Sequence, residues 1–270
     1  MDELKDATGE AVQGEAPEGS YGVPDYVMVR VRAEDWNAAA HLLRRELEKP
    51  GAQSLSDARN IGCSAVLCSV LQQLRDFEPH HHHQLAVEIN DLVTRLAPVL
   101  LNARGEMAQT PETRSRLANI VGFAAVNAAE DLPEDKAARL LDRGIGLMEL
   151  STSLTNETIA AKDFSFSANN LAMGYQIKAR RQDAEGARQS LEHAIELMQR
   201  VIRADERLAH SLKVSERSVS RTMYLDHLNL GLVCNDLGNR TYSKKMISVN
   251  QRNLPSSIGA RYLLSLVRAI

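Results

Sequence analysis

Thiols and imidazoles are the side chains of this sequence best suited to nucleophilic chemistry. They belong to Cys63, Cys68, Cys234, His193, His210 and His227. Catalysis needs a thiolate within hydrogen-bond reach of its base, but no spacing selects one such pair. Phosphate-binding glycine loops, nucleophile elbows and zinc-protease signatures do not occur in the sequence. We therefore expect no enzymatic activity and no cofactor, with the cysteines as buried free thiols and Asp226 and His227 as a helix-surface pair.

Four consecutive histidines form the most unusual local composition, from His80 to His83. At a helix start His80 and His83 stand three residues apart on one face, a spacing at which two imidazoles can hold a metal ion. The nearest acidic residues, Glu78 and Glu88, are not at a spacing typical of a third ligand. We expect a solvated loop here and keep His80 and His83 as the alternative metal site.

Residues 205–223 resemble the helix-turn-helix of bacterial DNA-binding domains. In that comparison Leu208 and Ala209 belong to the first helix, Val214 and Ser215 to the turn, and Val219 to the second helix. The resemblance implies that Arg217, Ser218 and Arg221 reach phosphates and base edges in a major groove. Lys213 stands where the motif has glycine, and a plain junction between two helices is the competing interpretation.

The composition indicates which elements position these residues. The 270 residues include 33 Ala and 34 Leu, whereas aromatic residues make up 4%. Such a composition favours helices and argues against sandwiches, barrels and propellers. The formal net charge of -3 argues against a protein that coats nucleic acid. The acidic start carries no export signal, and the odd number of cysteines fits a reducing compartment, so we expect a cytoplasmic protein with no membrane contact.

Apolar residues recur at spacings of three and four along most of the chain, which predicts helices. They are expected near 34–48, 55–76, 81–102, 112–130, 133–152, 158–180, 184–210, 215–237, 241–251 and 255–269. Pro111 and Pro133 mark first turns, and Asp183 and Ser215 are candidate N-caps. Residues 26–32 alternate with period two, which predicts a short strand or an extended lead-in to the first helix. Short connections imply antiparallel helix pairs.

One triplet recurs in the first helix of each expected pair, an Asn followed by an aliphatic and then a compact residue. Its copies are Asn60-Ile61-Gly62, Asn119-Ile120-Val121, Asn170-Leu171-Ala172 and Asn229-Leu230-Gly231. The compact residue lets a paired helix approach closely, while the Asn, which stands one position before the aliphatic residue, faces another side of the helix. The sequence therefore predicts four helical hairpins, at about 55–102, 112–152, 158–210 and 215–251.

These copies resemble the tetratricopeptide repeat, most clearly at Asn170-Leu-Ala-Met-Gly-Tyr175 and at Asn229-Leu-Gly-Leu with its closing Leu237-Gly238 turn. The spacing of 51 to 59 residues exceeds the usual 34 of that family, and its aromatic knobs are mostly missing. The resemblance implies an all-α solenoid of α-α hairpins whose first helices line a concave groove. It also implies that Asn60, Asn119, Asn170 and Asn229 bind the backbone of an extended peptide. Asn residues that bridge helices inside the scaffold are the competing interpretation.

The two ends complete the expected organisation. Residues 1–20 carry six acidic residues and one Lys, and we expect a flexible tail before a single helical-repeat domain at 21–270. Residues 235–270 carry six basic residues and Asp236, and the segment 255–269 is expected to cap the last hairpin. The resulting hypothesis is a scaffold that binds a protein or peptide as an adaptor, chaperone or regulator. The alternative is a DNA-binding transcriptional regulator.

Overall fold

The computed structural model describes residues 21–50, 55, 57–102, 110–155, 161–212 and 216–241. Within these ranges the chain is all-helical and contains no strand, as the composition predicted. The helices are α2 (Asp25–Arg32), α3 (Trp36–Leu47), α4 (Ala58–Phe77), α5 (His82–Leu101), α6 (Pro111–Ala128), α7 (Glu134–Leu154), α8 (Ala161–Ala179), α9 (Ala184–Leu212) and α10 (Glu216–Thr241). Two short 3-10 helices, η1 (Pro79–His81) and η2 (Ala129–Asp131), join neighbouring helices. The predicted tail at 1–20 and the predicted cap at 255–269 lie outside the described residues.

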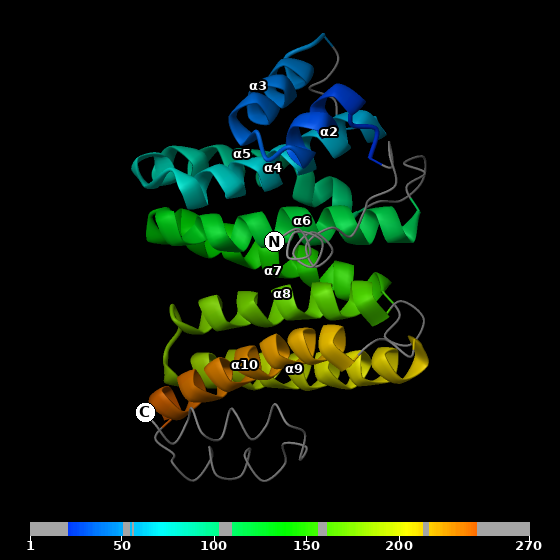
Figure 1. Cartoon of the computed structure of the whole chain (residues 1–270). Coiled ribbons are helices and arrows are strands. Elements are labelled where there is room, and N and C mark those ends of the chain that lie inside the picture. The colour runs from blue at the N-terminus through cyan, green and yellow to red at the C-terminus, as the bar shows by residue number, and fades with distance from the viewer. Residues whose placement is uncertain are drawn as a thin grey trace.

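The helices stack in layers, from α2 and α3 at one end to α9 and α10 at the other (Figure 1). Pairs form between α4 and α5, α6 and α7, and α8 and α9, and α10 packs along α9. Successive pairs meet both through α4, α6 and α8 and through α5 and α7. We call α4, α6, α8 and α10 the first helices and α5, α7 and α9 the second helices. Parallel first helices therefore lie side by side through the stack.

The predicted apolar stripes are the faces that the second helices bury. On α7 the buried stripe is Ala137, Leu140, Leu141, Gly144, Ile145 and Met148. On α9 it is Ala187, Leu191, Ala194, Ile195, Met198 and Ile202. Both stripes follow the three-and-four spacing that places residues on one side of a helix, so this part of the prediction is confirmed.

Two helix starts follow the predicted signals, at Pro111 and Asp183, whereas Pro133 precedes α7 as its N-cap residue and the candidate cap Ser215 lies outside the described residues. The Thr110 hydroxyl accepts a hydrogen bond from the Thr113 amide at 3.2 Å, and Pro111 takes the first helical position of α6. The Asp183 carboxylate accepts a hydrogen bond from the Gly186 amide at 2.8 Å ahead of α9. Each cap satisfies an amide that the first turn leaves without an intrahelical partner.

Three buried serines link the central helices. The hydroxyl oxygens of Ser115 on α6 and Ser151 on α7 are 2.9 Å apart, and those of Ser151 and Ser167 on α8 are also 2.9 Å apart. Ser115 also hydrogen-bonds the Ser151 carbonyl oxygen at 3.1 Å. We call these residues the serine chain. Its hydroxyls satisfy one another where three helices meet away from water.

Residues 26–32 correct the prediction of a strand or extended lead-in, because Asp25–Arg32 forms helix α2. Val27 is fully buried and Val31 packs against the core, whereas Val29 is 57% exposed. Val27 and Val31 are four residues apart, so both face the same side of a helix, while the exposed Val29 faces another side. The same residues also alternate with period two in the sequence, which is why a strand was predicted. A helix satisfies its own backbone groups, while a lone strand has no partner.

A second correction concerns the expected Leu237-Gly238 turn. Both residues lie inside α10, which continues to Thr241. The Leu237 side chain is buried in the core. This packing keeps α10 helical at Gly238, although a glycine in a helix costs about 1 kcal/mol relative to alanine. The second helix expected at 241–251 lies beyond the last described residue.

Candidate functional site

Asparagine side chains join the first helices across the stack. The Asn170 amide nitrogen donates to the Asn119 side-chain oxygen at 3.3 Å, which links α8 to α6. The Asn229 amide nitrogen donates to the Asn169 side-chain oxygen at 3.2 Å, which links α10 to α8. We call Asn119, Asn169, Asn170 and Asn229 the amide row. Three of the four predicted groove residues therefore belong to one interhelical arrangement.

Members of the amide row differ in their access to solvent. Asn119 is only 3% exposed, whereas Asn169, Asn170 and Asn229 are half-buried. A side-chain amide has two donor hydrogens and an oxygen with two lone pairs, so one interhelical bond leaves further positions on the half-buried amides. Asn60 is half-buried on α4 and lies one layer before Asn119. Asn119 acts within the scaffold, while the half-buried residues border its surface.

Asn169 was not predicted, because it stands one residue before the recurring triplet and is not part of that pattern. Its role depends on α10 packing against α8, which no local pattern in α8 reveals. A second bond between these helices, from the Gln176 amide nitrogen to the Asp236 carboxylate at 2.6 Å, was missed for the same reason. The two contacts fix the register of α10 along α8.

The N-terminal ends of three first helices meet at an ion pair and a tyrosine. Arg116 on α6 lies 3.4 Å from the Asp163 carboxylate on α8. Tyr21 precedes α2 and is 9% exposed; burial raises the pKa of its phenol, and the nearby charge of Arg116 opposes that rise. The Tyr21 backbone lies against Gly62 of α4. This tyrosine was not predicted, because nothing in residues 21–24 indicates where they pack.

Asp226 and His227 are buried, which corrects the prediction of a helix-surface pair. They are 4% and 1% exposed. Burial and a hydrogen bond with Asp205 on α9 raise the pKa of Asp226 from 3.8 to about 8, and Ser165 on α8 donates to Asp205 at 2.6 Å. Burial lowers the pKa of His227. Asp205 and Asp226 thus lie together between three helices, with burial favouring the protonated form of Asp226, and no local pattern in the sequence indicated this arrangement.

The thiols are protonated and enclosed. Burial raises the pKa of Cys63 to about 11, of Cys68 to about 12 and of Cys234 to about 11. Cys63 and Cys68 are buried and Cys234 is half-buried, and all three are free. Because the thiolate is the nucleophilic form, these residues are poorly suited to catalysis. The prediction of buried free thiols is confirmed at Cys63 and Cys68.

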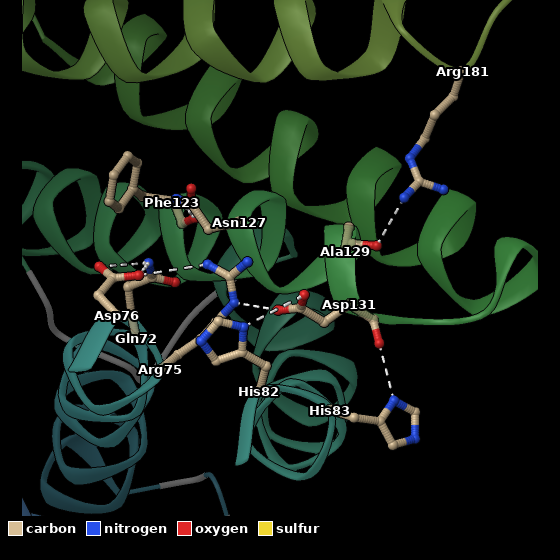
Figure 2. Close-up of polar contacts among 10 residues, drawn as sticks. All are labelled: Gln72, Arg75, Asp76, His82, His83, Phe123, Asn127, Ala129, Asp131 and Arg181. Atoms are coloured by element: carbon tan, nitrogen blue, oxygen red, sulfur yellow. Dashed lines mark hydrogen bonds and ion pairs between the residues drawn. The ribbon is translucent and has the colours of Figure 1, made fainter. Parts of the chain in front are cut away.

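A polar corner joins α4 and α5 to the turn between α6 and α7 (Figure 2). The guanidinium group of Arg75, which is 9% exposed, forms an ion pair with Asp131 and lies 3.6 Å from Asp76. Arg181, beyond α8, donates to the Ala129 carbonyl oxygen at 3.0 Å on the other side of the turn. These contacts bond the Asp131 side chain and the Ala129 carbonyl oxygen of η2, and they tie α4 and the end of α8 to the turn between α6 and α7.

The histidine run takes part in this corner. His83 donates from Nδ1 to the Asp131 carbonyl oxygen at 2.9 Å, and Nδ1 of His82 lies 4.0 Å from the Asp131 carboxylate (Figure 2). His80 is exposed on η1. In the described part of the chain, no three His, Cys, Asp or Glu residues gather closely enough to hold a metal ion. The contacts therefore give His82 and His83 a structural role at the corner.

The helix-turn-helix prediction falls mostly outside the described residues. The turn at 213–215 is not described, and neither are the side chains of Arg217, Ser218 and Arg221. The backbone of 216–223 is part of α10, a helix of 26 residues that packs along α9. DNA binding by these three residues stays a prediction.

None of the described helices combines the length and apolar character needed to cross a bilayer. No protein-family model, curated protein or solved structure matches the chain.

Proposed function

We propose that the chain is a tetratricopeptide-like solenoid that binds an extended peptide or protein segment along its first helices. The amide row carries this proposal. Its bonds join α6 to α8 through Asn119 and Asn170, and α8 to α10 through Asn169 and Asn229, so in each case two successive first helices share a pair of oriented amides. An extended peptide presents backbone donors and acceptors at regular intervals, and amides held on successive helices complement them.

Preorganisation supports the same proposal. The interhelical bonds hold each amide in place before a ligand arrives, which reduces the entropy lost on binding. Asn170 and Asn229 keep partial exposure beside these bonds. The adaptor, chaperone and regulatory roles all use such a surface, and the site chemistry itself is recognition of peptide backbone.

The experiment uses peptides selected from a random displayed library against the full chain. The affinity of a selected peptide is measured for Asn170→Ala and Asn229→Ala. Each variant should bind about two- to tenfold more weakly, because a hydrogen bond contributes about 0.5–1.5 kcal/mol. Asn90→Ala is the matched control, since Asn90 lies on the second helix α5 and bonds its neighbour Asp91 at 3.4 Å.

Circular dichroism melting establishes that each variant is folded at the temperature of the titration. Peptides that bind both amide-row variants and Asn90→Ala with the affinity of the original chain would contradict the proposal. Loss confined to Asn170→Ala and Asn229→Ala would support it.

A further inference from the structure

The segment before α2 lies across the N-terminal ends of the first helices. Gly22 has a φ of +69°, and a Cβ there would come within 2.9 Å of the Arg59 Cα on α4. A Cβ on Gly62 would lie 1.8 Å from the Tyr21 carbonyl oxygen. The backbone of Tyr21 and Gly22 therefore lies directly on α4, and Gly62 is the residue whose missing side chain permits this approach.

The Tyr21 side chain continues across the next two layers. It lies close enough to Arg116 of α6 for that charge to influence the pKa of its phenol, and Arg116 is paired with Asp163 of α8. Tyr21 and Val23 are both buried in the core cluster. One short segment thus contacts α4 through its backbone and α6 through its side chain, and reaches α8 through the Arg116–Asp163 pair.

These contacts lie at one end of the surface that carries the amide row. Arg116 precedes Asn119 by three residues on α6, which is close to one helical turn. Asp163 precedes Asn170 by seven residues on α8, which is close to two turns and the same side of the helix. The segment and the amide row therefore occupy neighbouring parts of the first-helix surface.

We propose that Tyr21–Val23 is an intramolecular ligand that covers the Gly62–Arg116–Asp163 end of the peptide-binding surface and must leave it when a partner binds. This inference rests on the proposed function and specifies its regulation. The partner it fits is a peptide with a tyrosine, then a glycine that adopts a positive φ, then a small aliphatic residue. Tyrosine supplies buried area close to Arg116, and glycine permits contact with α4.

Self-occupancy lowers the apparent affinity for such a peptide. For a ligand that binds only the open form, the apparent dissociation constant equals the intrinsic dissociation constant divided by the fraction of chains that are open. Because Tyr21 is attached to α2, its effective concentration at the site is high. Weakening the attached segment should therefore strengthen binding of the same sequence supplied separately.

The probe is a fluorescein-labelled peptide of residues 14–25, titrated onto full-length chains by anisotropy. Tyr21→Ala should bind it at least tenfold more tightly than the original chain does. Tyr175→Ala is the matched control and should not change the affinity, because Tyr175 lies near the other end of α8, where its hydroxyl contacts Glu149 of α7. The same peptide carrying Ala at its tyrosine should bind at least tenfold more weakly to the Tyr21→Ala chain.

Gly62 gives a second test within the Tyr21→Ala chain. Gly62→Ala places a methyl group where the peptide backbone must lie and should weaken binding at least tenfold. Gly146→Ala should leave it unchanged, because a Cβ at Gly146 meets no atom within 4 Å. In the chain with Tyr21 intact, Gly62→Ala should expose the bond after Tyr21 to chymotrypsin at least tenfold more than Gly146→Ala does.

The inference is overturned if the folded Tyr21→Ala chain fails to bind the peptide more tightly, or if Gly62→Ala leaves the bond after Tyr21 protected. A library-selected peptide that needs Asn170 and Asn229 would then still support the proposed function. Conversely, tight binding of the 14–25 peptide together with no effect of Asn170→Ala on library peptides would uphold the segment's site and reject the amide row.

Discussion

Gly122 of α6 and Gly144 of α7 face each other where their helices cross. A Cβ added at Gly144 would lie 2.9 Å from the Gly122 carbonyl oxygen, and one added at Gly122 would lie 2.7 Å from the Gly144 carbonyl oxygen. Backbone lies against backbone at this crossing, and the side chains of Met148 and Val126 also come within 3 Å of the added Cβ positions, so moving one side chain would not make room. The close approach of α6 and α7 depends on both glycines.

Gly144→Ala should destabilise the protein by about 1–3 kcal/mol, because the added methyl group overpacks the crossing. Gly146→Ala, two residues along the same helix, should instead stabilise it by about 0.5–1 kcal/mol, since its Cβ meets open space. Urea unfolding followed by circular dichroism measures both. Equal effects of the two substitutions would argue against the crossing as the cause.

Arg75→Met should cost about 3 kcal/mol or more, because it leaves the Asp131 carboxylate without its partner at a mostly buried corner. Arg139→Ala is the control: its pair with Asp135 is exposed on both sides, and its effect should remain within about 0.5 kcal/mol. Urea midpoints at constant pH give both values. A loss at Arg75 no larger than that at Arg139 would show that the corner contributes little.

Asp226→Asn should change how stability depends on pH. The folded protein keeps a proton on Asp226 up to about pH 8, whereas an unfolded carboxyl releases it near 3.8. The folded state therefore binds more protons between these values, and this group's contribution to stability falls as pH rises from about 4 to 8. An Asn has no such loss, so the melting temperature of Asp226→Asn should exceed that of the original chain by an increasing amount over this range.

His227 titrates in the opposite sense, because its lowered pKa favours unfolding at acidic pH, but it is present in both chains of that comparison. Asp135→Asn removes an exposed carboxylate from α7 and serves as the control for replacing an Asp by Asn outside the buried pair. Melting temperatures of Asp226→Asn and the original chain that change in parallel with pH would refute the raised pKa of Asp226.

Cys63 and Cys68 should resist a maleimide at pH 7.5 while the protein is folded, since their raised pKa values leave few thiolates and burial blocks access. Mass spectrometry should find rapid modification of all three cysteines in concentrated urea. Cys234, which is half-buried, should react at an intermediate rate. Fast labelling of Cys63 or Cys68 in the folded chain is the result that would count against this reasoning.

Local patterns were sufficient for the helices and their buried stripes, and failed where a pattern fitted two structures. Val27, Val29 and Val31 fit an alternating strand, yet burial of the first and exposure of the second follow from helix α2 packing on α3. Gly238 satisfies the pattern of a turn, but the burial of Leu237 keeps α10 helical. In both places contact with another helix decided between local alternatives.

Only part of the candidate site could be predicted from the sequence. A repeated triplet marked Asn119, Asn170 and Asn229, because equivalent positions in stacked pairs recur in the sequence. Their partner Asn169 and the buried Asp205–Asp226 pair depend on which residues of distant helices meet. A charged Asp226 next to His227 has the composition of a helix surface, and only the packing of α8 and α9 encloses it.

The serine chain restricts how this protein can diverge. Ser151 hydrogen-bonds both Ser115 and Ser167, so replacing Ser151 leaves the Ser167 hydroxyl without this partner, whereas Ser115 keeps its bond to the Ser151 carbonyl oxygen. Substitutions at Ser151 and Ser167 are therefore not independent, and a chain that has lost Ser151 but keeps Ser167 is less stable than one that has lost both. Among descendants of this sequence, these two positions should change together.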